Sequence, residues 1–185
     1  MTNRPGISKY FIAIVPPSPI FEQVWQWKEY FKIKFNSKAS LNSPPHITLH
    51  MPFEWKASKE DFLLKSLTEF STQCSPFEIA LQNFGCFPPR VIFIHVVENP
   101  ELVQLQLALT HFCKAEFNLF NANRLDLPYH PHLTVAFRDL KKSVFPLAWA
   151  QVEHADFKQR FTCNSLALLK HNGKQWEVRS TFGFS

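Results

Sequence analysis

The sequence predicts an α+β fold in which strands and helices alternate along one chain of 185 residues. Short runs rich in β-branched and aromatic residues alternate with longer segments whose apolar residues recur at helical spacing. The order of elements is roughly βαβαββ followed by αβαββ, so the second half repeats the first in outline. Connections between elements are short. We therefore expect a single domain, residues 1–185, made of two pseudo-equivalent lobes.

The strands are predicted from their composition and from the turn residues that bound them. The run at 10–15, YFIAIV, is apolar throughout and stops at two prolines, as a buried strand would. Asn172-Gly173 separates two further segments and is typical of a tight hairpin turn. The expected strands are 10–15, 46–53, 77–83, 91–97, 130–135, 161–170 and 175–184.

Helices are predicted where apolar residues recur every three or four positions. Ser18 before Pro19 is a candidate N-cap, and Ser58 is followed three residues later by Asp61, as in a capping box. Asn99 before Pro100 opens a third helix in the same way. The expected helices are 18–33, 58–70, 99–112 and 144–154.

Composition limits the kinds of protein that this chain can be. Hydrophobic residues make up 45% of it, which is enough for a sizeable core and argues against disorder. The net charge of +5 favours an anionic partner, and nucleic acid is one candidate. No two of the four cysteines form a Cys-x-x-Cys pair, and no signal-type or membrane-spanning apolar stretch is present. We expect a cytoplasmic, reduced protein that binds no membrane and is a monomer.

Two segments share the pattern Pro-His-aliphatic-Thr-aliphatic, one in each half of the chain. They are residues 45–49, PHITL, and residues 131–135, PHLTV. Because successive side chains of a strand point to opposite faces, the histidine and threonine of each motif share one face. The four polar motif residues are His46, Thr48, His132 and Thr134. Roughly one match to His-x-Ser/Thr is expected by chance, but two matches in the same context are far less so.

These residue types suit phosphodiester chemistry if the two motifs face each other. One histidine can deprotonate the attacking oxygen while the other protonates the leaving oxygen, since both titrate near neutral pH. Two threonine hydroxyls can donate hydrogen bonds to the non-bridging phosphate oxygens. The sequence leaves open which histidine is the base and which is the acid. This chemistry needs no metal and no cofactor.

The pair of motifs resembles the signature of the 2H phosphoesterase superfamily, and the whole chain resembles its 2′-5′ RNA ligase branch. The likeness covers FIAIVPP, PPHITLHMPF, RVIFIHV and YHPHLTVAFR. The resemblance implies a bilobal, pseudo-two-fold fold with two antiparallel sheets lining a central cleft and helices outside. It also implies hydrolysis of a terminal 2′,3′-cyclic phosphate on RNA, or formation of 2′-5′ linkages. His46 and His132 become the acid and base, and Thr48 and Thr134 the phosphate donors.

Several neighbouring residues admit a functional and a structural interpretation. Arg138 would share a face with His132 if its strand ran that far, and Arg90 precedes the strand at 91–97; both could bind substrate phosphate, or be solvated surface residues. Two further histidines lie near the motifs: His50, four residues after His46 and expected on the same face, and His130, two before His132. They raise the possibility of a metal site, which the absence of a nearby carboxylate or thiolate disfavours. Four aromatic residues near strand ends could stack on bases or belong to the core: Phe53, Trp55, Phe84 and Phe87.

The sequence leaves three functions open. The first is a phosphoesterase or ligase acting on RNA ends. The second is a cyclic phosphodiesterase for a small nucleotide, such as a cyclic ADP-ribose phosphate or a 2′-5′ oligonucleotide. The third is an RNA-binding module without catalysis, which the two intact motifs disfavour.

Overall fold

A computed structural model describes residues 5–120 and 128–185 of the chain. Its strands are β1 (Ile7–Ile14), β2 (Ile47–Lys56), β3 (Phe77–Phe87), β4 (Val91–Val96), β5 (His132–Ala136), β6 (Lys158–Cys163), β7 (Ser165–His171) and β8 (Trp176–Gly183). Its α-helices are α1 (Ile20–Phe35), α2 (Glu60–Ser71), α3 (Pro100–Phe117) and α4 (Phe145–Ala150), with 3-10 turns at Ala39–Asn42 and Ala57–Lys59. The α+β class is confirmed.

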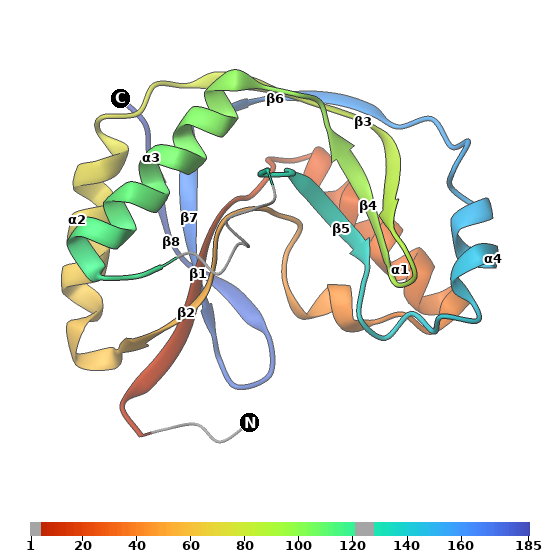
Figure 1. Cartoon of the computed structure of the whole chain (residues 1–185), viewed down its shortest axis with the longest axis horizontal. Coiled ribbons are helices and arrows are strands. Elements are labelled where there is room, and N and C mark those ends of the chain that lie inside the picture. Colours follow the sequence, from red (N-terminus) through yellow and green to blue (C-terminus); the bar gives the residue numbers. More distant parts are fainter. Residues whose placement is uncertain (1–4, 121–127) are drawn as a thin grey trace.

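All eight strands belong to one antiparallel sheet with the order β6-β3-β4-β5-β2-β1-β7-β8. The two sheets that the family resemblance implied are thus two four-stranded halves of one sheet. They meet where β2 pairs with β5, and the register there places Ile47 opposite Leu133. The sheet is strongly curled, so the two halves face different directions (Figure 1). Each half mixes segments from both ends of the chain, because β1 and β7 are neighbours while β6 pairs with β3.

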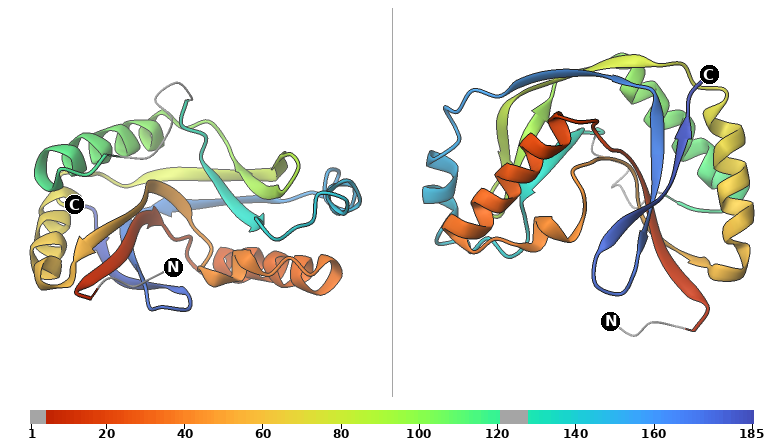
Figure 2. Two further views of the ribbon diagram at one scale, coloured as in Figure 1. Left: turned by 60° about the horizontal axis from the view of Figure 1, so that its bottom comes forward. Right: turned by 180° about the vertical axis from the view of Figure 1, so that it is seen from behind.

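The helices cover opposite halves of the sheet. Helices α2 and α3 contact β8 and β2, whereas α1 contacts β5. Figure 2 shows the same division from two other sides, with α1 beside β4 and β5, and α2 and α3 beside β1, β7 and β8. Alternate residues of the strands pack beneath these helices in the main core, among them Ile12, Ile47, Leu133 and Leu168. The other face of the central strands is therefore left uncovered by these helices, and it carries the motif residues.

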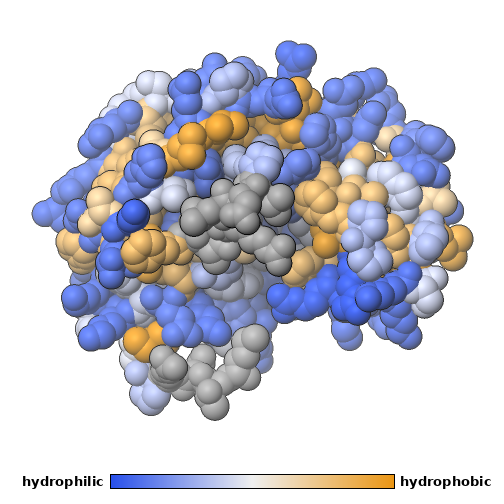
Figure 3. Space-filling view, viewed as in Figure 1, coloured by the Kyte–Doolittle hydropathy of each residue, from blue (hydrophilic) through white to orange (hydrophobic). Residues whose placement is uncertain are grey.

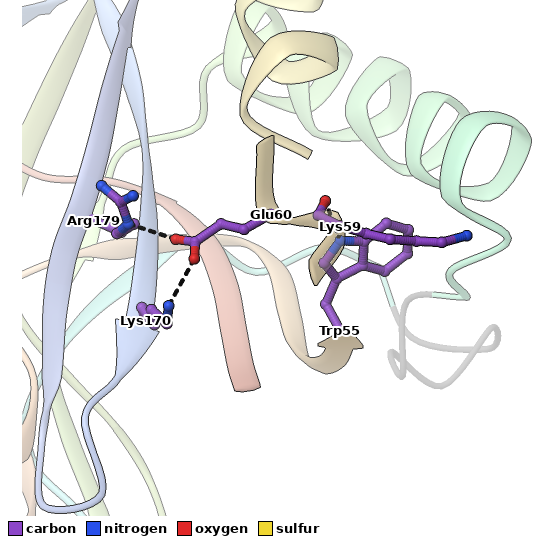
Figure 4. Close-up of polar contacts among 5 residues, drawn as sticks. All are labelled: Trp55, Lys59, Glu60, Lys170 and Arg179. Carbon is purple, nitrogen blue, oxygen red and sulfur yellow. Dashed lines mark hydrogen bonds and ion pairs between the residues drawn. The ribbon is translucent and has the colours of Figure 1, made fainter. Parts of the chain in front are cut away.

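A cluster of charged side chains links α2 to β7 and β8. Glu60, at the start of α2, accepts hydrogen bonds from Lys170 of β7 at 2.8 Å and from Arg179 of β8 at 2.5 Å. Figure 4 shows both basic side chains pointing at this one carboxylate, with Trp55 donating to the backbone of Lys59 beside it. Burial raises the pKa of Glu60, but the two basic partners outweigh it and lower that pKa overall. The carboxylate is thus held ionised where helix and sheet meet.

Two strand boundaries differ from the sequence expectation. The segment expected as one strand at 161–170 is divided at Asn164, and its two parts, β6 and β7, pair with different strands. This division lets the chain cross from one half of the sheet to the other. The strand expected at 130–135 begins only at His132. The hairpin turn at Asn172-Gly173 is confirmed, with Gly173 at a φ of 99°.

The predicted helix caps are confirmed in one case of three. Asn99 caps α3 by accepting a hydrogen bond from the Leu102 amide at 2.7 Å. Ser18 is not the cap of α1, because its hydroxyl donates to Glu22 instead and Pro19 occupies the N-cap position. Ser58 lies in a 3-10 turn before α2 and makes no cap either.

None of the helices in residues 5–120 and 128–185 is both long and apolar enough to cross a membrane. All four cysteines lie in this described part and are free thiols: Cys74, Cys86, Cys113 and Cys163.

Candidate active site

The register between β2 and β5 brings the two motifs together. Ile47 and Leu133, the middle residues of the motifs, lie opposite each other and are fully buried in the core. Since side chains alternate along a strand, the residues on either side of this pair project to the opposite face of the sheet. Those residues are His46, Thr48, His132 and Thr134, and all four are partly exposed. We call this face of the sheet the motif face.

The two motif histidines are fixed by matching hydrogen bonds. The Nδ1 atom of His46 lies 2.7 Å from the carbonyl oxygen of Pro44, and Nδ1 of His132 lies 2.7 Å from that of His130. A carbonyl oxygen can only accept, so Nδ1 carries the proton in both neutral rings. In each case the accepting carbonyl belongs to the residue two positions earlier, across a proline. Nε2 of each ring is therefore the nitrogen left for acid–base chemistry.

An aromatic ring from the neighbouring strand packs against each histidine. Phe11 of β1 lies with its centroid 4.8 Å from the His46 ring, and Phe93 of β4 lies 5.0 Å from the His132 ring. Both phenylalanines are 3% exposed. Phe93 also needs Gly85 beside it on β3, since a Cβ at Gly85 would stand 2.5 Å from its ring. The two imidazoles are thus held in similar aromatic surroundings on both sides of the β2–β5 pair.

Burial leaves both histidines neutral in the free protein. It lowers the pKa of His46 to about 3, and the Lys28 ammonium and the His132 ring act in the same direction against the hydrogen bond to Pro44. Burial also lowers the pKa of His132, opposed by the hydrogen bond to the His130 carbonyl and assisted by the His130 ring. The effect of the His132 ring on His46 follows from their proximity. An anionic phosphate between them would raise both pKa values.

Lys28 of α1 lies beneath the segment that leads to His46. It is 1% exposed, and its Nζ donates to the carbonyls of Ser40 at 3.0 Å and Ser43 at 2.9 Å. Burial lowers the pKa of Lys28 to about 7. The segment is also tied to the end of the second motif strand, because the Ser40 hydroxyl donates to the Val135 carbonyl at 2.8 Å. No pattern in the sequence marks this lysine, because a single lysine on a helix is usually a surface residue.

Tyr129 is a second residue that supports the site and that the sequence did not indicate. Its hydroxyl donates to the carbonyl of Thr48 at 2.9 Å, so the residues before the second motif are bonded to the strand of the first. Burial raises its pKa, and the hydroxyl therefore stays protonated and remains a donor. The only signal in the sequence is its closeness to His130 and His132.

The two predicted arginines lie beside each other, outside the motif strands. Arg90 donates from Nη1 to the carbonyl of Arg138 at 3.3 Å, and both residues are exposed. The strand ends at Ala136, and Arg138 has a φ of 52°, so the alternation that would have placed it with His132 does not reach it. The neighbouring Asp139 binds the backbone amides of Lys38 and Ala39, each at 2.9 Å.

Of the two further histidines, His50 does not share the face of His46. A shift in the β1–β2 register places His50 opposite Ile12, a core residue, and His50 is 1% exposed. The expectation from simple alternation is therefore wrong at this position. His130 does lie near His132, with ring centroids 6.0 Å apart, and its ring also stands 5.9 Å from that of His95. Among the described residues no group of three or more His, Cys, Asp or Glu is arranged to hold a metal ion.

Of the four aromatic candidates for base stacking, only Phe87 lies at the site. Phe53, Trp55 and Phe84 pack with the main core. Phe87 is 40% exposed, and its ring lies 5.3 Å from that of His132. Figure 3 shows hydrophobic residues gathered over β4 and β5 on the side viewed there. An exposed aromatic surface next to a motif histidine can accept the flat face of a nucleobase.

Curated relatives resemble this chain over most of its length. A protein of Geobacillus kaustophilus named "Putative phosphoesterase GK0864" is 28% identical over 178 residues, which cover 94% of this chain and 95% of that protein. A Bacillus cereus protein named "Putative phosphoesterase BCAH820_1309" is 30% identical over 143 residues, which cover 75% of this chain and 78% of that protein.

Solved structures show the same fold. E. coli LigT complexed with 3′-AMP matches with a TM-score of 0.70 at 22% identity, covering 97% of this chain and 99% of LigT. TT0787 of Thermus thermophilus matches with a TM-score of 0.67 at 19% identity, covering 95% of this chain and 97% of its own. The sequence model of the 2′-5′ RNA ligase superfamily matches residues 16–175. The chain is therefore a member of the 2′-5′ RNA ligase superfamily of 2H phosphoesterases.

Proposed function

We propose that this protein is a metal-independent phosphoesterase acting on RNA ends, which opens a terminal 2′,3′-cyclic phosphate to a 2′-phosphate. The observation that carries the proposal is the β2–β5 register, which sets two imidazoles with free Nε2 atoms on one face of the sheet. Each imidazole has a threonine hydroxyl two residues along the same strand. This is the set of groups that in-line displacement at phosphorus requires.

The two histidines take different roles in this reaction. One motif histidine is neutral and acts as the base: its Nε2 takes a proton from water as the water oxygen attacks phosphorus. Bound phosphate raises the pKa of the other motif histidine, whose Nε2 then carries a proton and acts as the acid. As the bond from phosphorus to O3′ breaks, that proton passes to O3′. The products are a 2′-phosphate and a free 3′-hydroxyl.

The threonines and the substrate complete the mechanism. The hydroxyls of Thr48 and Thr134 donate to the non-bridging phosphate oxygens, where negative charge grows in the transition state. If the 5′-hydroxyl of a second RNA replaces water as nucleophile, the same transfers give a 2′-5′ phosphodiester. Arg90 and Arg138, which lie side by side, would meet phosphates beyond the reacting one.

A second candidate is a phosphodiesterase for small cyclic nucleotides. It is favoured by the solved relatives, since LigT of E. coli is described in complexes with 3′-AMP, ATP and NADP+. These ligands are nucleotides rather than RNA chains. The same histidines and threonines would act on them without change of role.

The test is a panel of 2′,3′-cyclic phosphates, from mononucleotides to oligonucleotides, with analysis of the monophosphate formed. We expect 2′-phosphate products, a rate unaffected by EDTA, and losses of roughly 10²–10⁴ in rate for His46→Ala or His132→Ala. His154→Ala serves as the matched control because His154 is exposed and away from the motifs. Full activity after both motif replacements, or RNA binding without turnover of any member of the panel, would refute the proposal.

A further inference from the structure

The motif face has a different chemical character on the two sides of the β2–β5 pair. Beyond His46, on β1 and β7, it is apolar: Phe11, Ala13, Ala167 and Leu169 form a small cluster of buried residues, against which Val15 and Trp176 pack. This cluster is separate from the main core. A surface of this kind offers nothing to an anion. Basic side chains that can bind a further phosphate lie on the opposite side, on β6.

On that opposite side, strand pairing carries the motif face from His132 outward to the edge of the sheet. His132 lies opposite His95 of β4, so both side chains project to the same face. Immediately after β4, the Val97 amide donates to the Ala80 carbonyl of β3 at 2.9 Å. Ala80 in turn lies opposite Arg160 of β6. The motif face thus continues across β4 and β3 onto β6.

Two basic side chains lie where the motif face reaches the edge strand β6. Arg160 pairs with Ala80 and Lys158 pairs with Gln82, and both basic residues are exposed. Their strand neighbours confirm the alternation, since Phe161 and Leu81 are buried in the core on the other face. A pocket of ≈ 420 Å³ lies here. The motif-face side chains that line it are Ala80, Gln82, Lys158 and Arg160.

Nearby carboxylates do not neutralise this pocket. Lys158 lies 3.1 Å from Asp156, but both side chains are largely exposed, and such surface pairs are weak and easily exchanged for another anion. Glu78, further along β3, accepts a hydrogen bond from the Thr162 hydroxyl. In the described residues no carboxylate forms an ion pair with Arg160. Its guanidinium is therefore available to bind a phosphate with two hydrogen bonds.

The distance from the histidines decides what kind of ligand can use this pocket. Adjacent strands are about 4.8 Å apart, so the three steps from β5 to β6 span roughly 14 Å. A ligand with one phosphate cannot occupy both places. We propose that Lys158 and Arg160 form a second phosphate site, which binds an internal phosphodiester of an oligoribonucleotide whose cyclic end lies at the motif histidines. This inference rests on the proposed function and narrows its substrate class to chains of several nucleotides.

The test compares a 2′,3′-cyclic mononucleotide with a short oligonucleotide ending in the same cyclic phosphate. The variant is Lys158→Gln/Arg160→Gln, and the matched control, which removes the same charge from α2 and α3, is Lys65→Gln/Lys114→Gln. We expect kcat/KM for the oligonucleotide to fall roughly tenfold in the test variant only, with the mononucleotide unchanged. The salt dependence for the oligonucleotide should also weaken, by a log–log slope of about 1.4 for two lost contacts.

A binding measurement separates this inference from the proposed function. Fluorescence anisotropy with a labelled oligonucleotide ending in a stable 3′-phosphate needs no turnover. Weaker binding by the test variant supports the second phosphate site even if no cyclic phosphate is hydrolysed, in which case only the proposed function fails. Binding and turnover of the oligonucleotide equal to wild type, or equal losses in both double variants, would overturn the inference. Circular dichroism establishes that each variant is folded.

Discussion

Ile47 and Leu133 lie opposite each other in the pairing that joins β2 to β5, and each is the central residue of a His-x-Thr motif. Both side chains are fully buried. Their contact holds together two strands that carry all four polar motif residues. The alignment of the candidate active site therefore depends on an apolar contact on the far side of the sheet.

Truncating either of these residues should destabilise the protein strongly. We expect Leu133→Ala to lower the free energy of unfolding by about 2–5 kcal/mol, because it leaves a cavity in the main core. Leu147→Ala is the matched control, since Leu147 is 62% exposed and should change this quantity by less than about 0.5 kcal/mol. Urea denaturation measures both. Similar small losses in the two variants would show that the β2–β5 contact is not a packed core contact.

Substitutions at Gly85 and Phe93 should have non-additive effects on the free energy of unfolding. A methyl group at Gly85 would stand 2.5 Å from the Phe93 ring, which packs against His132. We expect Gly85→Ala to cost about 1–3 kcal/mol through overpacking and to lower activity by moving that ring. In a Phe93→Ala background the same change should cost little, so a double-mutant cycle would give a clear coupling energy. Gly183→Ala is the control, because nothing lies within 4 Å of its added Cβ. Additive effects at the two positions would contradict the contact.

The lowered pKa of His46 should appear in the dependence of stability on pH. An imidazole in the unfolded chain takes up a proton near pH 6.5, whereas His46 in the folded protein does so only near pH 3. Between these values the unfolded state binds more protons, so folded stability falls as pH decreases, by at most about 1.4 kcal/mol per pH unit. Well above pH 6.5 neither state binds this proton, and the group then contributes no slope.

His46→Gln should remove that part of the slope. Unfolding measured by urea from about pH 7 to about pH 4 should therefore show a smaller decline in the variant than in the wild type. His111→Gln, at an exposed position on α3, controls for the loss of a histidine from the unfolded chain. Parallel declines in the wild type and His46→Gln would mean that His46 titrates normally when folded.

Lys28 should influence the titration of His46 from beneath the preceding segment. Its ammonium helps to keep His46 neutral, so Lys28→Met should raise the pKa of His46. An NMR titration of the imidazole resonances measures this directly. The same variant leaves the Ser40 and Ser43 carbonyls without their donor, so some loss of stability is expected as well. Lys32→Met on the exposed side of α1 should leave the histidine titration unchanged.

The position of the second motif relative to the first could not be read from the sequence. Alternation along a strand correctly indicated that His46 and Thr48 share a face, and that Ile47 and Leu133 belong to the core. It failed at His50, where a shift in the register with β1 turns the side chain inward. It also could not reach Arg138, because the strand ends before it. Bulges and strand ends depend on the pairing with a neighbouring strand, so local sequence patterns do not predict them.

By itself the sequence determined the α+β class, most of the strands and helices, and the four polar residues of the two motifs. These follow from spacing along the chain, because the periods of strands and helices are set by local backbone geometry. Only the tertiary structure decided that β2 lies beside β5, that Phe11 and Phe93 pack on the histidines, and that Lys28 lies beneath His46. Those contacts join residues far apart in sequence, and it is the packing of the whole core that selects them.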